Sequence, residues 1–472
     1  MENKITHIAV VSIPAFSHQA SIVEFCKRLV HFHHNFHVTC IFTTIDSPPQ
    51  ATITFLQSLP PTIDYIFLPP INKQDLPKNV PLALQIHEAV SKSLPYFHHS
   101  LKSLCSSKNP LVALIADPFA NETLEIAKEF NLLSYIYFPP SAMTLSLFMH
   151  LPTLHEEVSC EYKDYKEAFH IPGCLPLHGN DLPEHLHDRS SPSYELILER
   201  CKRFSLAYGF LVNSFSEIEG KTVSTLVEIG KKPVYLVGPV IQTGASIEPN
   251  ESECIKWLEN QRPKSVLYLS FGSGGTLSEE QVNELAFGLE SSGQKFLWVF
   301  RAPNDSANAL YLGASNDDSL QFLPDGFLER TKGQGLVVPN WAPQTQILSH
   351  TSIGGFLTHC GWNSTLESIV LGVPMITWPL FAEQRMNAVL LTKGLKVALR
   401  PKFNDNGIAE RKEIAEVIKE LMLGVEGNEI SQKIEELKYA AVSALKEDGS
   451  STKALSQFIT DIESFLSQKS TN

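Results

Sequence analysis

Short apolar runs rich in β-branched residues alternate with stretches of helical spacing along the first part of the chain. Between the runs, apolar residues recur at intervals of three and four. Strands separated by helices pair in parallel, and a parallel sheet binds its ligand at the carboxyl ends of its strands. We therefore expect an α/β fold built on a doubly wound parallel sheet. The expected strands cover residues 7–12, 38–43, 63–68, 111–116 and 134–138, and the expected helices 21–29, 81–105 and 122–130.

The length of the chain, 472 residues, is too great for one ordinary core, so more than one domain is expected. We predict a first domain over residues 1–241, a polar, turn-rich linker over 242–251, and a second domain over 252–451. Residues 150–203 are rich in Pro and His, and we expect an irregular wall and lid over a pocket there. Residues 302–321 form a long polar stretch, and we expect a loop there.

A glycine-rich turn opens the second domain. The apolar run 265–271 is followed by Gly272-Ser273-Gly274-Gly275 and a helical stretch over 279–291. Such a turn between strand and helix can bind a phosphate. It does not complete the dinucleotide fingerprint G-x-G-x-x-G, because Leu277 stands at the last glycine position. This disfavours an NAD-dependent oxidoreductase.

The most informative stretch covers residues 341–384, WAPQTQILSHTSIGGFLTHCGWNSTLESIVLGVPMITWPLFAEQ. Two strands, 353–357 and 373–378, enclose a helix over 363–371. The free N–H groups at the start of that helix can bind a phosphate. Ser364 and Glu367 also fit a capping box that merely starts the helix. The local pattern leaves both interpretations open.

This stretch resembles the donor-binding signature of plant family 1 UDP-sugar glycosyltransferases, at both ends and in the THCGWNSTLES centre. The resemblance extends over nearly the whole chain. It implies the GT-B architecture, in which two Rossmann-like domains face each other across a cleft. It also implies that the C-terminal helix, residues 452–472, packs back on the first domain.

The resemblance assigns the donor-site residues. It implies that Trp341 stacks on uracil and that the Ala342 backbone bonds the uracil edge. It implies that Gln344 and Glu367 hold the ribose and that the remaining residues bind the diphosphate and the sugar. The diphosphate residues are Ser273, His359, Asn363 and Ser364, and the sugar residues are Trp362, Glu383 and Gln384.

His18 and Asp117 each follow an expected strand of the first domain. Taken alone, each is more often a capping or surface residue than a catalytic one. Both match the family's catalytic pair, in which the histidine is the general base and the aspartate orients it. An imidazole can take the proton of an acceptor hydroxyl, and a carboxylate can fix its tautomer.

The loop that carries His18 departs from the family pattern. Relatives commonly show PSPGMGHLIP, whereas this chain has SIPAFSHQAS, with Ala15 and Ser17 in place of glycines and Ser21 in place of proline. The departure retains the histidine but puts the shape of the loop, and the fit of the acceptor, in question.

The resemblance is nearest to the hydroquinone, monolignol and flavonoid glucosyltransferase branch, on the strength of VEFCKRL, FLPP, SLPYF and FLVNSF. It implies inverting transfer of glucose from UDP-glucose to a hydroxyl of a small phenolic metabolite, giving a β-glucoside. Gln384 implies glucose rather than galactose. The alternatives are a catalytically impaired UDP-sugar binding protein and a UDP-sugar epimerase. Apolar acceptor contacts could come from Phe16, Phe119, Phe138, Phe148 and Leu182, or these could be core residues.

Composition and charge limit which classes of partner the protein can bind and which cellular compartment it suits. The net charge of −13 without a basic block argues against nucleic acid and anionic membranes. The N-terminus does not have the pattern of a secretory signal, and no apolar run is long enough to span a membrane. The eight scattered cysteines are expected to be reduced thiols in the cytoplasm. We further expect a monomer, and no metal ion, since the chain has no D-x-D pair.

Overall fold

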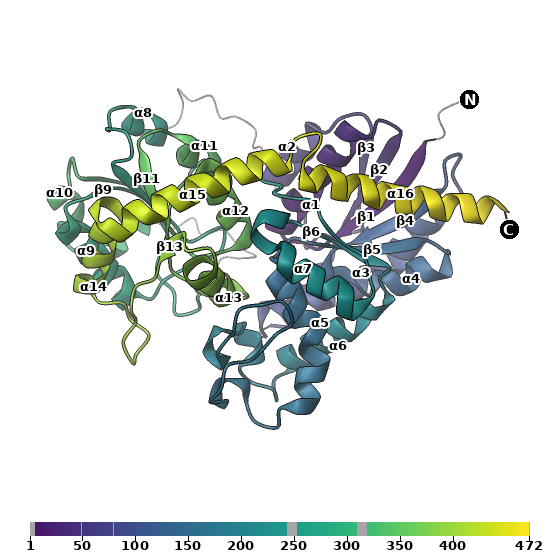
Figure 1. The fold of residues 1–472 in the computed structure, drawn as a ribbon, viewed down its shortest axis with the longest axis horizontal. Helices are drawn as coiled ribbons and strands as arrows, with labels where there is room; N and C mark the ends of the chain where they lie inside the picture. The colour runs from purple at the N-terminus through teal and green to yellow at the C-terminus, as the bar shows by residue number, and fades with distance from the viewer. Residues whose placement is uncertain (1–4, 49, 79, 243–252, 309–318, 472) are drawn as a thin grey trace. The chain divides into compact units, whose positions relative to one another are not determined.

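The computed structural model describes residues 5–48, 50–78, 80–242, 253–308 and 319–471. The chain divides into two compact units. One comprises Met1–Gly179, His185–Gln242 and Ser443–Asn472, and the other comprises Asn180–Glu184 and Thr243–Val442. Each has a β-sheet with helices packed around it (Figure 1). The expected linker, apart from Gln242, and residues 309–318 of the expected loop lie outside the described residues.

The first unit is built on a seven-stranded sheet in the order β3-β2-β1-β4-β5-β6-β7, with neighbouring strands parallel. Every residue of its central strands β1 and β5 is buried, because helices cover both faces of a parallel sheet. The strands are β1 (Thr6–Ser12), β2 (Phe36–Phe42), β3 (Ile63–Phe67), β4 (Leu111–Ala116), β5 (Leu133–Phe138), β6 (Gly209–Val212) and β7 (Val234–Leu236).

Eight described helices belong to this first unit, and the last comes from the end of the chain. In α16 the residues Leu455, Phe458, Ile459 and Ile462 form one buried stripe at helical spacing in the core of the sheet. Among the described residues, no helix is both long and apolar enough to cross a membrane. The helices are α1 (Phe16–Phe32), α2 (Gln50–Gln57), α3 (Leu82–Cys105), α4 (Thr123–Glu129), α5 (Ala142–Glu157), α6 (Pro192–Arg203), α7 (Ser216–Gly230) and α16 (Ser450–Thr471).

The second unit has a six-stranded parallel sheet in the order β10-β9-β8-β11-β12-β13. Its strands are β8 (Val266–Ser270), β9 (Lys295–Phe300), β10 (Gly335–Pro339), β11 (Ile353–Thr358), β12 (Met375–Thr377) and β13 (Ala398–Leu399). Its helices are α8 (Glu253–Glu259), α9 (Glu279–Ser292), α10 (Phe327–Arg330), α11 (Gln344–Ser349), α12 (Trp362–Leu371), α13 (Gln384–Val389), α14 (Arg411–Leu423) and α15 (Val425–Ala444).

The expectation of irregular structure over residues 150–203 is partly wrong. Helix α5 continues through Pro152 to Glu157, and α6 begins at Pro192. Ser191 caps α6 by accepting the Tyr194 N–H at 3.2 Å, so Ser-Pro marks a helix start rather than a loop. Between the two helices the chain contains short 3-10 turns and one isolated antiparallel bridge between Phe169 and Leu177.

Both sheets share one topological feature. Counted within each sheet, the first strand lies between the second and the fourth, so the chain reverses its direction of winding there. The reversal lies between β1 and β4 in one unit and between β8 and β11 in the other. Ligands of doubly wound sheets bind at the carboxyl ends of such a strand pair. The two loops that follow each pair are therefore where functional side chains are to be sought.

Candidate active site

At the reversal in the first sheet, a histidine meets an aspartate. His18 lies in the first turn of α1, which starts earlier than the sequence suggests and follows β1 closely. Asp117 follows β4 and caps the 3-10 helix η2 (Pro118–Ala120), accepting the Phe119 N–H at 2.9 Å. His18 Nδ1 lies 2.7 Å from Asp117 Oδ2. The two residues that the sequence predicts as a pair are therefore in hydrogen-bonding contact.

The geometry of this pair defines which nitrogen of His18 can act as a base. A carboxylate can only accept a hydrogen bond, so Nδ1 carries the proton and Nε2 is the basic nitrogen. The Asp117 side chain is 1% exposed and that of His18 is 14% exposed. A buried carboxylate thus holds a partly accessible imidazole in one tautomer, the arrangement that general-base catalysis requires.

The substitutions in the His18 loop leave this pair intact. Ala15 is the N-cap residue of α1 with φ −131°, a backbone conformation that does not need glycine. Ser21 is buried and its Oγ lies 2.9 Å from the Tyr137 hydroxyl, so the serine that replaces proline has a hydrogen-bond partner. The Phe119 ring lies 5.5 Å from the His18 ring and is its aromatic neighbour.

The five apolar acceptor candidates have different surroundings. Phe138 and Leu182 are fully buried, and Phe138 packs against Phe148 in the interior. Phe16 is 37% exposed. Phe119 is half-buried against the histidine.

At the reversal in the second sheet, the start of α12 presents backbone N–H groups. Its N-cap is Gly361, which makes no side-chain cap, and its first turn contains Trp362, Asn363 and Ser364. The capping-box interpretation is therefore wrong, because Ser364 lies inside the helix. The remaining interpretation, anion binding by the first-turn N–H groups, stays a prediction. Cys360 takes a φ of 65° to turn the chain from β11 into this helix.

His359 lies beside this helix start and is packed against two glycines. A Cβ added at Gly272 would lie 2.4 Å from His359 Nε2, and one added at Gly361 would lie 2.5 Å from it. Burial, together with the Arg301 cation, lowers the pKa of His359 to about 4. Nδ1 of His359 is buried and has no hydrogen-bond partner among the described residues. The side chain is thus a neutral imidazole that a bound anion could engage.

Gln344 and Glu367 form a second polar group at this edge. Gln344 Nε2 donates to Glu367 Oε2 at 2.7 Å and to Ser364 Oγ at 2.9 Å. Burial raises the pKa of Glu367 to about 7, although the Gln344 hydrogen bond acts in the opposite direction. The sequence predicts these residues as ribose ligands, and the structure places the carboxylate and the amide side by side.

The first and last residues of the signature differ sharply in exposure. Trp341 is 61% exposed, which leaves an aromatic face accessible, whereas Ala342 is buried. Ser273, after β8, is exposed as well. Gln384 is buried, and its Oε1 accepts the N–H groups of Leu380 at 2.8 Å and Phe381 at 3.0 Å. Two hydrogen bonds fill the lone pairs of that oxygen, so Gln384 can meet a sugar only as a donor.

Arg301 is a residue of this site that the sequence interpretation missed. It follows β9, its Nη1 donates to the Gly272 carbonyl, and its charge contributes to the low pKa of His359. The sequence around Arg301 does not indicate this role, because the groups that Arg301 interacts with, Gly272 and His359, belong to other loops.

Comparisons with known proteins give consistent results. The family model described as UDP-glucoronosyl and UDP-glucosyl transferase matches residues 238–419. The chain is 50% identical over 465 residues to a hydroquinone glucosyltransferase of Rauvolfia serpentina, covering 98% of both proteins.

Two solved structures are similar over 98% of this chain and 100% of theirs. UGT2 of Phytolacca americana, complexed with UDP-2-fluoro-glucose and pterostilbene, has a TM-score of 0.88 at 44% identity. A UDP-glucosyltransferase from Polygonum tinctorium capable of glucosylating indoxyl, in complex with 3,4-dichloroaniline, has a TM-score of 0.90 at 45% identity.

Proposed function

Because the chain belongs to the UDP-glucoronosyl and UDP-glucosyl transferase family and has its GT-B fold, we propose that it transfers glucose from UDP-glucose to a small phenolic acceptor. The transfer inverts the anomeric carbon and yields a β-glucoside. The observation that carries this proposal is the 2.7 Å contact between His18 and Asp117 at the reversal of the first sheet. An intact pair of this kind speaks against a catalytically impaired binding protein.

The chemistry assigned to His18 is proton removal. As the phenolic oxygen attacks C1 of glucose, Nε2 of His18 takes the hydroxyl proton, and the bond from C1 to the UDP oxygen breaks. Asp117 keeps Nδ1 protonated and stabilises the imidazolium that forms. The proton, the glucosyl group and the leaving UDP are thereby all accounted for.

The donor roles are assigned to the second unit. Trp341 offers its exposed face to uracil, the Ala342 backbone bonds the uracil edge, and Gln344 with Glu367 holds the ribose diol. The first turn of α12, with Ser273 and His359, takes up the charge that develops on the diphosphate. Trp362, Glu383 and Gln384 contact the sugar. We propose that no metal ion takes part, because the helix dipole and neutral donors suffice to bind the anion.

The acceptor class follows from what the relatives' names state. One relative is a hydroquinone glucosyltransferase, and one solved structure contains pterostilbene. The 3,4-dichloroaniline complex extends the range to aromatic amines. We therefore propose small aromatic acceptors, with a phenol hydroxyl as the preferred nucleophile and an aromatic amine as a further one.

The test is an assay of UDP-glucose with a panel of phenols and anilines, with products resolved by mass spectrometry and with EDTA in a parallel series. We expect a glucoside from at least one phenol and unchanged rates in EDTA. No UDP release above the rate without acceptor would contradict the proposal. A loss of activity in EDTA that only a divalent cation restores would contradict the metal-free mechanism.

We also propose a cytoplasmic monomer. Five of the eight cysteines, all of them thiols, are buried, as suits a reducing compartment. Light scattering of the purified protein would test the monomer, and localisation of a fluorescent fusion would test the compartment.

A further inference from the structure

A buried cation lies behind the turn that carries Asp117. Arg200, on α6, is 2% exposed. Burial lowers the pKa of its guanidinium, while the carboxylates of Glu122 and Asp117 act to raise it. Arginine stays protonated even so, and a buried positive charge is costly unless it has a role or a partner. The residues around Arg200 provide a partner for its charge and also indicate a role for it.

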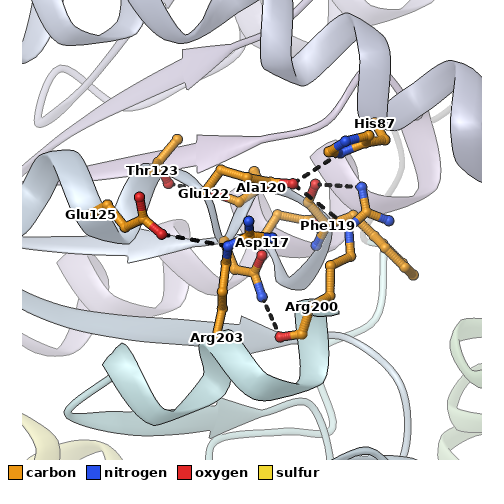
Figure 2. Close-up of polar contacts among 10 residues, drawn as sticks. His87, Asp117, Phe119, Ala120, Glu122, Thr123, Glu125, Arg200 and Arg203 are labelled. Carbon is orange, nitrogen blue, oxygen red and sulfur yellow. Dashed lines mark hydrogen bonds and ion pairs between the residues drawn. The ribbon is translucent and has the colours of Figure 1, made fainter. Parts of the chain in front are cut away.

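The guanidinium contacts Phe119 in two ways, and Figure 2 shows the polar contacts around both residues. Nη2 of Arg200 donates to the Phe119 carbonyl at 3.4 Å, and its central carbon lies 5.1 Å from the centre of the Phe119 ring. The ring in turn lies 5.5 Å from the His18 ring. Phe119 therefore links Arg200 to the histidine, and its own N–H is bound to Asp117 Oδ1.

A carboxylate compensates the charge of Arg200. Glu122 Oε1 lies 3.9 Å from Arg200 Nε and 3.0 Å from His87 Nδ1, as Figure 2 shows. Burial would raise the pKa of Glu122, but the His87 hydrogen bond and the Arg200 charge outweigh it and lower this pKa. Asn121 Nδ2 donates to the Arg200 carbonyl at 2.9 Å and ties α6 to the same turn.

The contacts of Arg200 are not those of a residue that serves stability alone. Its Nε and Nη1 atoms are buried and have no hydrogen-bond partner among the described residues. A buried ion pair with unmet donors stabilises a fold less than an apolar side chain of the same volume. What the guanidinium does provide is one N–H that donates to the Phe119 carbonyl and a planar cation that lies over the Phe119 ring, a combination that no apolar residue offers.

We infer that Arg200 is a positioning residue for the transfer reaction: through the carbonyl and ring of Phe119 it fixes residues 117–120 so that Asp117 stays in contact with His18. The inference rests on the proposed function, because it assigns no chemistry to Arg200 itself. Phe119, which contacts His18 directly, transmits the constraint. The Glu122 carboxylate, which also contacts His87, balances the positive charge of Arg200. Arg200 can therefore hold the turn in place without adding a net charge next to Asp117.

The test compares Arg200→Met with Arg203→Met in glucosylation of a series of phenols of increasing acidity. Arg203 is the matched control, because it lies on the same helix and pairs with Glu125 at 3.5 Å at the surface. For weakly acidic phenols we expect Arg200→Met to lower kcat about ten- to a hundredfold, a part of the general-base contribution. The loss should shrink for strongly acidic phenols, which need less help from a base. Arg203→Met should change kcat less than about twofold.

Two further measurements separate positioning from a general loss of structure. The Kd for UDP should be unchanged in Arg200→Met, because the residues proposed to bind UDP belong to the other unit, Thr243–Val442. In an Asp117→Asn background, Arg200→Met should lower kcat by less than about twofold, since residues that act as a unit are not additive. If the methionine variant does not fold, Arg200→Lys replaces it, since it keeps the charge but loses the planar guanidinium over the Phe119 ring.

Several results would overturn the inference. They are an unchanged kcat in Arg200→Met, an equal loss with every phenol, and full additivity with Asp117→Asn. The proposed function has its own control: no glucoside from any phenol with the unmodified enzyme would overturn that proposal, whereas full activity of His18→Ala would overturn the assignment of His18 as the base, whatever the Arg200 variants do.

Discussion

The two sheets have the same strand order at their points of reversal but present different groups there. In the first sheet the site consists of charged and ionisable side chains in contact, His18 with Asp117 and the Arg200 network behind them. In the second sheet it consists of backbone N–H groups at the start of α12, an amide beside the Glu367 carboxyl, and an imidazole whose pKa is lowered by burial and by the nearby Arg301. One edge suits proton transfer and the other suits an anion.

The difference shows that topology supplies only the location of a site. Proton transfer needs a base that is held in one tautomer, and a buried carboxylate provides it. A diphosphate needs hydrogen-bond donors that stay in contact with it as negative charge develops on it. The oriented N–H groups at the start of a helix are such donors. The residues in two pairs of loops therefore decide what each of two similar sheets does.

The largest expected effect is loss of the base in the first sheet. His18→Ala should lower kcat for a phenol by roughly 10²–10⁴-fold, the usual contribution of a general base. The Kd for UDP, measured by calorimetry, should not change. His37→Ala is the matched control, because His37 also contacts an aspartate, Asp64 at 3.0 Å, but away from the reversal. A fall in kcat of less than about tenfold would show that His18 is not the base.

The second largest effect should come from filling the space beside His359. Gly272 has a φ of +75°, and a Cβ there would meet the His359 ring. Gly272→Ala should raise the Kd for UDP by about ten- to a hundredfold, from backbone strain and displacement of the ring. Gly293→Ala is the control, because Gly293 has a φ of +69° but nothing within 4 Å of its Cβ position. Equal effects of the two variants on UDP binding would refute the role of the histidine.

A smaller effect concerns the ionisation of Glu367. Its pKa is raised to about 7, so in the free protein the carboxylate forms as the pH rises through that value. A carboxylate accepts hydrogen bonds from a ribose diol more strongly than a carboxylic acid does. The Kd for uridine should therefore fall, up to about tenfold, between about pH 5.5 and about pH 8. Uridine lacks phosphate, which removes any contribution from His359. Glu367→Gln should abolish the pH dependence, and a dependence that survives this substitution would assign it to another group.

The smallest expected effect concerns donor choice. We expect UDP-glucose to be preferred over UDP-galactose and UDP-glucuronate in kcat/KM by several-fold to about tenfold per contact, the value of a hydrogen bond to a hydroxyl. Gln384→Ala should raise the KM for UDP-glucose and erode the preference. Gln384→Glu keeps an acceptor for the Leu380 and Phe381 N–H groups but loses the donor, so it should erode the preference as well. Equal turnover of UDP-glucuronate by the unmodified enzyme would show the donor assignment to be wrong.

The alternation of apolar runs and helical stretches correctly predicted the doubly wound sheets, since strand runs are local in the sequence. The strand predicted over residues 111–116 coincides with β4 (Leu111–Ala116). The contact of His18 with Asp117 could be predicted from the family resemblance, which pairs the two residues, and it agrees with the strand pattern, because the ends of parallel strands meet at one edge of the sheet. The depressed pKa of His359 could not be predicted, since it depends on burial and on Arg301, which comes from a different loop.

Arg200 was missed for a similar reason. It lies in a region whose proline and histidine content predicts irregular structure, yet a Ser-Pro pair starts a helix there. Nothing in the local sequence distinguishes Arg200, which is buried, from Arg203, which is partly exposed on the same helix. That distinction depends on which face of α6 packs against the Asp117 turn, and packing of this kind is not encoded locally.

The stripe of α16 that completes the first core has a consequence for synthesis. Leu455, Phe458 and Ile462 belong to the same core as Val10 and Ile115, although hundreds of residues separate them in the chain. Ser451 donates to the Gly238 carbonyl, and Arg28 donates to Thr452, so polar contacts join the same parts. A ribosome releases the second unit's strands before it makes this helix. The unit whose synthesis begins first is therefore the last to have all of its core available, and we expect truncation at the C-terminus to destabilise the unit that contains His18.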